Sequence, residues 1–94
     1  MSEVQLTVSI IELCDACGAD QQVIIEMVDF GVLEVEPPQA EQPEQWLFQT
    51  AVIERAQKAL RLHHDLAINL EGVALALDLL EEIDELRLQL AELQ

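Results

Sequence analysis

Basic residues are scarce in this chain, and none occurs in its first half. The 94 residues include only four Lys and Arg against 19 Asp and Glu, which gives a formal net charge of −15, and the first of the four is Arg55. Nucleic-acid affinity depends mainly on cationic contacts to phosphates. The deficit therefore argues against direct DNA binding. The acidity favours a basic protein partner, because opposite charges accelerate association. The alternative is that the acidity only confers solubility.

Aromatic residues and long apolar runs are also lacking. Tyr is absent and only one Trp and two Phe occur, so the core must be aliphatic. Hydrophobic residues nevertheless make up 51% of the chain, enough to predict an ordered domain and not a disordered acidic segment. No window of about 18 apolar residues exists, so we expect no membrane span. The start of the chain lacks the basic and apolar regions of a signal peptide, so we expect a cytoplasmic protein.

The two cysteines and two histidines lack the spacing of a metal site. Cys14 and Cys17 form a single CxxC pair, which cannot close a tetrahedral zinc site, and His63 and His64 are adjacent. A reactive thiol needs an electropositive setting, whereas this pair is expected late in a short helix beside Asp15. We expect structural cysteines, a half-buried His63 and an exposed His64. Since no phosphate-binding loop or nucleophile motif occurs, the sequence predicts neither a cofactor nor an enzyme.

Helix signals in the N-terminal third predict two short helices joined by a tight turn. Ser9 and Glu12 have the spacing of a capping box, and Gly18 offers a left-handed end to the first helix. Asp20 is the expected N-cap of the second helix, which Gly31 follows. A connection of about three residues is typical of a helix-turn-helix unit.

Two apolar stretches after the second helix predict a short β-hairpin wing. Residues 32–35 favour one strand, the prolines at 37 and 38 end it, and residues 46–48 favour the returning strand. An acidic loop over residues 39–45 connects them. A weak strand or extended segment is expected over residues 6–10, ahead of the first helix.

Two longer helices are predicted to complete the chain. Thr50 is the expected N-cap of a helix that ends near Leu66, and Asn69 is the expected N-cap of the last helix. The outer side of the first of these helices is expected to carry Glu54, Lys58, Arg61 and Asp65. The residues expected to widen the apolar face of the last helix where it packs on the domain are Leu75, Leu77 and Leu80.

The last helix also carries an apolar seam with the period of about 3.5 residues that is typical of a coiled coil. Alternating steps of three and four residues join Ala76, Leu79, Ile83, Leu86, Leu90 and Leu93. Past residue 82 no other element of the chain is left to cover the seam, so a second copy of the same helix is the simplest cover. We predict a homodimer through Leu79, Ile83, Leu86 and Leu90, with a helix folded back on its own domain as the alternative. The chain then divides into a winged helix-turn-helix-like domain over residues 1–68 and a dimerisation helix over residues 69–94, packed on that domain.

The order of these elements resembles the MerR-type regulators. Residues 10–20 resemble their first helix and turn, and residues 30–37 resemble the Gly-Leu-Leu-x-Pro segment that leads into their wing. An Arg-Tyr-Tyr run precedes this Gly in that family, and residues 25–27 stand there as Ile-Glu-Met. The Arg-x-Tyr of the family's wing corresponds to residues 46–48, Trp-Leu-Phe. These departures remove the groups that would bind phosphates and read bases.

A closer resemblance covers nearly the whole chain. Residues 55–86 contain Leu-Arg-Leu-x-x-x-Leu at 60–66 and Leu-x-Gly-Val-Ala-x-Ala-Leu-x-Leu-Leu at 70–80. This segment is similar to the CbpM-type chaperone modulators, MerR-like proteins that bind the J-domain of the DnaJ-like cochaperone CbpA. The resemblance implies inhibition, because the modulator prevents the J-domain from engaging its Hsp70 partner. J-domains present a basic helix to an acidic Hsp70 surface, so an acidic competitor would be attracted to the same helix.

The J-domain contacts are expected on the third helix and the turn after it. The expected residues are Glu54, Arg61, Asp65 and Glu71, with Trp46 of the wing as an apolar anchor. Trp is enriched at binding hot spots, although a lone Trp in a small domain is often part of the core. The alternative for the charged residues is that Asp65 only ends the third helix and Glu71 only complements the N-terminal dipole of the fourth.

Two other classes of function stay open from the sequence. The first is a MerR-like transcriptional regulator or DNA-associated adaptor that acts through a basic partner subunit. The second is an anti-sigma or nucleic-acid-mimic role, which the charge alone supports.

Overall fold

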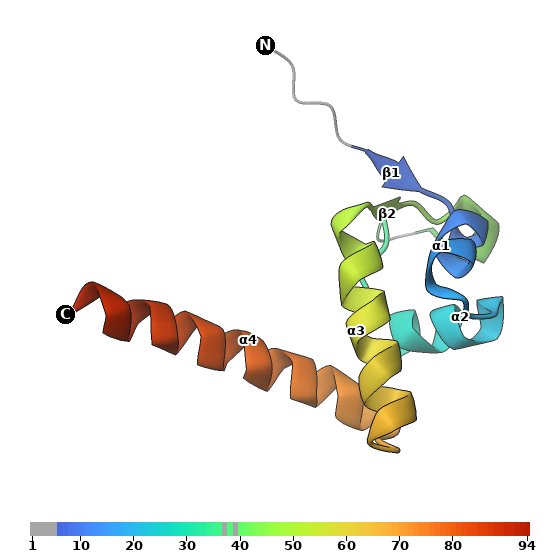
Figure 1. Ribbon diagram of the computed structural model, residues 1–94. Helices are drawn as coiled ribbons and strands as arrows, with labels where there is room; N and C mark the ends of the chain where they lie inside the picture. Colours follow the sequence, from blue (N-terminus) through green and yellow to red (C-terminus); the bar gives the residue numbers. More distant parts are fainter. Residues whose placement is uncertain (1–5, 37, 39) are drawn as a thin grey trace, which may run out of the picture.

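The computed structural model describes residues 6–36, 38 and 40–94, so expectations about the first five residues and positions 37 and 39 lie outside the described residues. The elements follow in the order β1 (Thr7–Val8), α1 (Ile10–Cys17), α2 (Gln21–Asp29), the 3₁₀ turn η1 (Pro43–Gln45), β2 (Phe48–Gln49), α3 (Ala51–Asp65) and α4 (Leu70–Glu92). This order confirms the mainly α fold class, with a helix-turn-helix unit and a long C-terminal helix (Figure 1).

The caps of α1 and α2 are those that the sequence predicts. Ser9 Oγ accepts from the backbone N–H of Glu12 at 3.2 Å, and the Glu12 carboxylate accepts from the backbone N–H of Ser9 at 2.9 Å. Gly18 ends α1 in the left-handed region, with φ of 67°. Asp20 Oδ1 then accepts from the N–H of Val23 at 3.0 Å and starts α2. The short connection between the two helices is thus fixed by local hydrogen bonds at both ends.

The wing is smaller than the sequence predicts. The expected strand over residues 32–35 does not form, because the N–H groups of Val32 and Leu33 both donate to Met27 O, at 2.8 and 3.3 Å, and so close the end of α2. These two donors are not available to a β-ladder. Among the described residues, the expected hairpin is reduced to one antiparallel bridge, between Glu36 and Leu47.

The returning strand pairs instead with the N-terminal segment. β2 lies antiparallel to β1, with Thr7 opposite Gln49 and Val8 opposite Phe48. Phe48 is fully buried, and the sheet places β1 beside β2, the strand that directly precedes α3. The weak strand expected over residues 6–10 is confirmed by β1.

One aliphatic core joins the helix-turn-helix unit to α3 and to the first turns of α4. Its buried residues are Ile10, Leu13, Cys14, Ile24, Met27, Val32, Leu33, Trp46, Phe48, Ala56, Ala59, Leu60, Leu70, Val73 and Leu77. The expectation for Leu77 is confirmed, whereas Leu75 is exposed. The two residues lie about 200° apart around a helix, so only one of them can face the domain.

The start of α3 and the start of α4 differ in their caps. Thr50 occupies the N-cap position of α3, but its backbone is already helical and its side chain makes no capping hydrogen bond. Asn69 caps α4 as predicted, since its Oδ1 accepts from the N–H of Gly72 at 2.8 Å. A Cβ at Gly72 would lie 2.8 Å from Ile68 Cγ2, so the tight turn requires glycine there.

Helix α4 leaves the domain as a free rod. Figure 1 shows it extending away from α3 and from the helix-turn-helix unit, with the C-terminus at its far end. Residues 81–94 are exposed along their whole length. The alternative in which this helix folds back on its own domain is therefore not the conformation observed. None of the described helices combines the length and apolarity needed to cross a bilayer.

Candidate functional site

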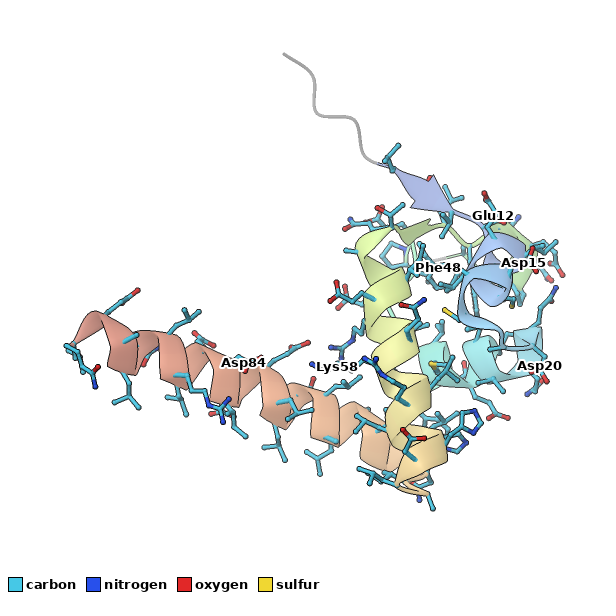
Figure 2. The ribbon with its side chains drawn as sticks, in the orientation of Figure 1. Glu12, Asp15, Asp20, Phe48, Lys58 and Asp84 are labelled. Carbon is cyan, nitrogen blue, oxygen red and sulfur yellow. The ribbon has the colours of Figure 1, made fainter. Side chains whose placement is uncertain are left out.

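The helix-turn-helix face is anionic. Figure 2 shows Glu12, Asp15 and Asp20 on the outer side of α1 and α2, away from α4. The exposed Gln22 donates its amide to Glu26 Oε1 at 3.3 Å, so a polar side chain that could read a base is held by a carboxylate. All four basic residues of the chain lie on α3 and α4. This face therefore lacks the cations with which a DNA-reading surface contacts phosphates.

Three of the expected partner residues lie together along α3. Glu54, Arg61 and Asp65 are exposed and share with Lys58 one stripe of the helix, since they are spaced by four, three and four residues. The stripe has a carboxylate at each end and two cations between them. The fourth expected residue, Glu71, is exposed in the first turn of α4, beyond the elbow over residues 66–69 that joins the two helices.

The elbow itself presents an apolar side chain between these charges. Leu66 is 62% exposed and directly follows Asp65. Ala67 has φ of 53°, a left-handed conformation that disfavours a residue with a Cβ. His63 Nδ1 lies 2.6 Å from Ile68 O and ties the end of α3 to the turn, and this ring is half-buried as the sequence predicts.

Trp46 is not an exposed anchor. Its side chain is 7% exposed, its Nε1 donates to Ala40 O at 3.2 Å, and its ring meets the Phe48 ring edge-to-face with centroids 6.2 Å apart. The indole is thus part of the core, and its one polar atom is already satisfied by the loop before η1. The exposed apolar residue of the wing is its neighbour Leu47, which is 43% exposed. Successive side chains of a strand point to opposite faces, so a buried Phe48 implies a buried Trp46 and an exposed Leu47. This alternation in the returning strand could have been used to predict which of the two residues is exposed.

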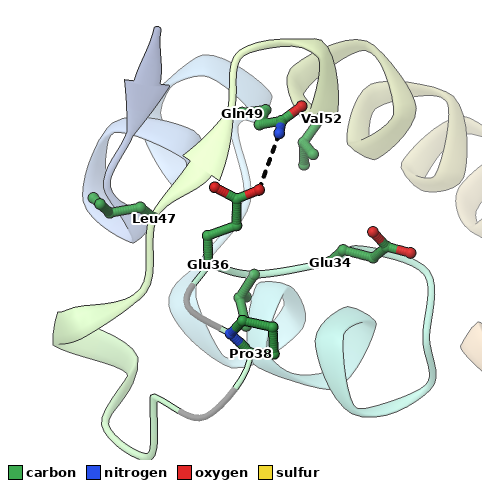
Figure 3. Close-up of a pocket in the computed structure, with 7 residues that line it drawn as sticks. Glu34, Glu36, Pro38, Leu47, Gln49 and Val52 are labelled. Carbon is green, nitrogen blue, oxygen red and sulfur yellow. Dashed lines mark hydrogen bonds between the residues drawn. The ribbon is translucent and has the colours of Figure 1, made fainter. Parts of the chain in front are cut away.

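A groove of about 550 Å³ lies between the loop after α2 and the start of α3. Figure 3 shows Glu34, Glu36, Leu47 and Val52 around it. Glu36 accepts from the Gln49 amide at 3.0 Å, while Glu34 is exposed on the other side. The groove thus combines apolar walls with negative charge, and sequence reasoning did not predict it.

Arg55 holds this region to α4. Its Nε donates to Val32 O at 2.6 Å, and its terminal nitrogens form ion pairs with Asp78, at 3.7 Å, and with Glu81. The guanidinium therefore connects the loop after α2, α3 and α4. Within the described residues these are the ion pairs that form, so the other cations are not neutralised by intramolecular partners.

The predicted seam of α4 is exposed. Leu79, Ile83, Leu86 and Leu90 are between 43% and 61% exposed and lie on one face of the helix. The domain meets the opposite face of α4, through the buried residues Leu70, Val73 and Leu77. The helix therefore presents one apolar face to its own domain and a second one to solvent.

Both cysteines lie in surroundings that disfavour the thiolate form. Cys14 is buried and Cys17 is half-buried. Burial raises the pKa of the Cys14 thiol, with the nearby carboxylates of Asp15 and Asp20 adding to the effect, and burial likewise raises the pKa of Cys17. Both thiols are therefore protonated at neutral pH. Among the described residues no group of three His, Cys, Asp or Glu side chains is placed to hold a metal ion.

Comparison with known proteins decides the family. The profile described as "MerR HTH family regulatory protein" matches residues 8–94. A relative from Pseudomonas putida (strain W619), named "Chaperone modulatory protein CbpM", is 39% identical over 75 residues, which cover 80% of this chain and 71% of the relative. A relative of the same name from Coxiella burnetii (strain Dugway 5J108-111) is 37% identical over 83 residues, covering 88% of this chain and 76% of the relative. The chain belongs to the CbpM family of chaperone modulatory proteins.

Membership of the CbpM family confirms the resemblance inferred from residues 55–86. This segment holds Lys58, Arg61 and Asp65 of the α3 stripe, the elbow and the first part of the seam. The family resemblance therefore covers most of the surface where charged and apolar side chains are exposed together. The anionic helix-turn-helix face thus belongs to a MerR-type fold. The fold alone does not establish DNA binding.

Proposed function

We propose that this protein is a non-enzymatic, cytoplasmic regulator that binds and masks the J-domain of a CbpA- or DnaJ-like cochaperone and so inhibits its cooperation with Hsp70. The observation that carries the proposal is membership of the CbpM family together with an anionic surface. The charge of −15 and the absence of Lys and Arg before Arg55 suit a partner that presents a basic helix.

The proposed contact surface consists of the α3 stripe and the elbow. Glu54, Arg61 and Asp65 supply exposed charges on α3, and Glu71 supplies a further carboxylate after the turn. Leu66 takes the place of Trp46 as the apolar residue, because it is exposed among these charges whereas Trp46 is buried. A rim of charges around an apolar residue is the usual organisation of a protein interface.

The proposal includes a homodimer formed through Leu79, Ile83, Leu86 and Leu90. Support comes from the exposure of these four residues on a helix that extends beyond its own domain. A repeating apolar seam of this kind is stable in water when a second helix covers it.

The test is charge reversal at the elbow. Asp65→Lys with Glu71→Lys should slow association with a purified J-domain and relieve inhibition of J-stimulated Hsp70 ATPase activity. Each exposed carboxylate should contribute roughly 0–1 kcal/mol to the free energy of J-domain binding. Stopped-flow association should also slow in the parent as salt shortens the Debye length from about 10 Å at 0.1 M to about 3 Å at 1 M.

The matched control is Glu41→Lys with Glu44→Lys, which makes the same change of net charge in the exposed loop before and within η1. This control should retain most of the inhibition. If the elbow variant lost stability but inhibited as well as the parent, Asp65 and Glu71 would have only helix-capping roles. If the parent bound no J-domain at all, the proposed function itself would be wrong.

A further inference from the structure

The groove between the loop after α2 and β2 exists because one rung of a β-ladder is missing. Glu36 and Leu47 exchange both backbone hydrogen bonds, with N···O distances of 2.9 and 3.0 Å. In an antiparallel ladder the next such pair would be Glu34 opposite Gln49, and these two described residues form no bridge. The segment ahead of Glu34 is hydrogen-bonded to the end of α2 instead. The two segments therefore diverge and leave a groove of about 550 Å³.

The walls of this groove are aliphatic, and its charged groups are carboxylates. Val35 and Val52 are half-buried along it, and Leu47 is exposed. The charged residues of the lining are Glu34 and Glu36, both of them exposed (Figure 3). A carboxylate accepts hydrogen bonds and cannot donate them. An occupant that suits this lining therefore needs an apolar body and a donor-rich, positively charged end.

Gln49 orients one of the two carboxylates. Its side-chain amide reaches across from β2 and donates to Glu36 Oε1 at 3.0 Å (Figure 3). The second oxygen of Glu36 accepts no hydrogen bond from the described residues. The side-chain donor of the lining is thus already used, while acceptor capacity remains.

The charge of the groove is not neutralised within the described part of the fold. Arg55 lines an adjoining cavity together with Glu34 and Val52. Its guanidinium is already held by ion pairs to Asp78 and Glu81. Neither carboxylate of the groove has an ion-pair partner among the described residues, so a cation from outside the chain can pair with them.

The backbone of β2 is also open toward the groove. The N–H of Thr50 donates to Leu6 O on the β1 side at 3.1 Å. Backbone groups alternate between the two edges of a strand, so those of Gln49 point to the opposite edge. They have no strand partner there among the described residues. A peptide backbone can pair with such an edge, which favours a protein segment over a free amino acid as the occupant.

The side chain of arginine has the chemistry that this lining requires. Its methylene stem packs on apolar surface while its charged end stays in a polar environment. The guanidinium carries five N–H donors in a planar fork, has no acceptor and binds carboxylates with two parallel hydrogen bonds. The ammonium of lysine is a compact and strongly hydrated point charge. Several acceptors around one groove suit the fork better than the point charge.

We infer that this groove binds an arginine side chain presented by a segment of a protein partner, with Glu34 and Glu36 as its acceptors. Its volume of about 550 Å³ lies within the range of about 300–1,000 Å³ that is usual for binding pockets. The groove therefore has room for the side chain and part of the adjoining backbone. It lies at the start of α3, whereas the elbow follows the end of α3. The inference thus adds a second contact surface and does not rest on the proposed J-domain contact.

Titration with short blocked peptides tests the inference. The probe is acetyl-Val-Arg-Val-amide, and the amide resonances of isotopically labelled protein are followed by NMR. Those of Leu47, Gln49 and Val52 should shift together, with one dissociation constant in the millimolar range. The same peptide with citrulline, the neutral isostere of arginine, should not bind, because it lacks the charge. The peptide with lysine should bind more weakly than the arginine peptide, because its ammonium lacks the fork of donors.

A matched pair of variants locates the site. Glu34→Gln with Glu36→Gln removes both charges and keeps an oxygen that can accept from Gln49. The dissociation constant of the arginine peptide should rise roughly 3- to 30-fold, as expected for two exposed ion pairs. The control, Glu41→Gln with Glu44→Gln, removes the same charge from the exposed loop before and within η1. It should bind the arginine peptide like the parent.

The remaining outcomes would overturn the inference. Equal binding of the arginine peptide and either the citrulline or the lysine peptide would show that the groove does not select a guanidinium. Equal losses in the two variants, or shifts spread over all anionic faces, would mean general attraction to an acidic protein. No shift at millimolar peptide would exclude the site. J-domain association is measured separately by stopped flow, so the proposed function and this inference can fail independently.

Discussion

Leu77→Ala should destabilise the protein by separating α4 from its domain. Leu77 is 2% exposed and packs α4 into the core. Truncation removes the equivalent of about three methylene groups, each worth roughly 0.8 kcal/mol of burial, and leaves a cavity, so the total cost lies at about 2–5 kcal/mol. A domain of this size has roughly 5–15 kcal/mol of stability. At about 3 kcal/mol the melting temperature should fall by roughly 12–24 °C.

The matched control is Leu79→Ala, the same truncation two residues further along the same helix. Leu79 is 50% exposed and lies on the seam. Its truncation should leave the fold of a single chain almost unchanged and weaken the dimer instead. Thermal denaturation by circular dichroism at several protein concentrations separates the two. The loss in Leu77→Ala should persist at every concentration, whereas the effect of Leu79→Ala should depend on concentration.

Equal losses for the two variants would refute this reasoning. They would mean that α4 does not use opposite faces for the domain and for a second helix. A neutral Leu77→Ala would likewise show that the first turns of α4 do not belong to the core.

Two further predictions concern the dimer and DNA. Ile83→Asp with Leu86→Asp places two carboxylates per chain in the seam at a cost of several kcal/mol, so sedimentation should give a monomer while the circular dichroism of the domain is retained; an unchanged dimer would exclude the seam as the interface. Random duplex DNA should show no mobility shift at low salt and the protein should pass through a heparin column, because the helix-turn-helix face has no cation; tight binding that weakens steeply with salt would contradict this.

The helix boundaries could be predicted because their causes are local. Ser9, Asp20 and Asn69 each accept a hydrogen bond from an N–H group three residues later, and such a bond depends on a few neighbouring residues. Gly18 and Gly31 adopt the left-handed backbone expected at helix ends. Thr50 is the exception. It occupies the predicted position, yet its side chain leaves the first turn of α3 without a cap. The local sequence does differ from that at Ser9, since Ile53 stands where Glu12 completes the capping box of α1.

The wing could not be predicted in the same way, because tertiary contacts decide it. Residues 32 and 33 have the β-branched and apolar character of a strand, but their N–H groups complete the end of α2. The returning strand then finds its partner in β1, at the other end of the domain's sequence. The burial of Trp46 is consistent with this pairing, because Phe48 lies in the core and its ring packs edge-to-face against the indole. A hot-spot preference for Trp carries no information about which face of a strand is buried.

The sequence gives the number of basic residues, and the structure shows which of them form ion pairs within the fold. Counting residues gives four cations, but it does not tell which of them are free to act on a partner. Arg55 is neutralised within the fold by Asp78 and Glu81 and bonded to the backbone of the loop after α2. Lys58 and Arg61 stand between two carboxylates on the α3 stripe. Arg87 alone lies in the exposed C-terminal part of α4. The helix-turn-helix face, which corresponds to the DNA-reading surface, therefore carries carboxylates and no basic side chain. All four basic residues lie instead on α3 and α4.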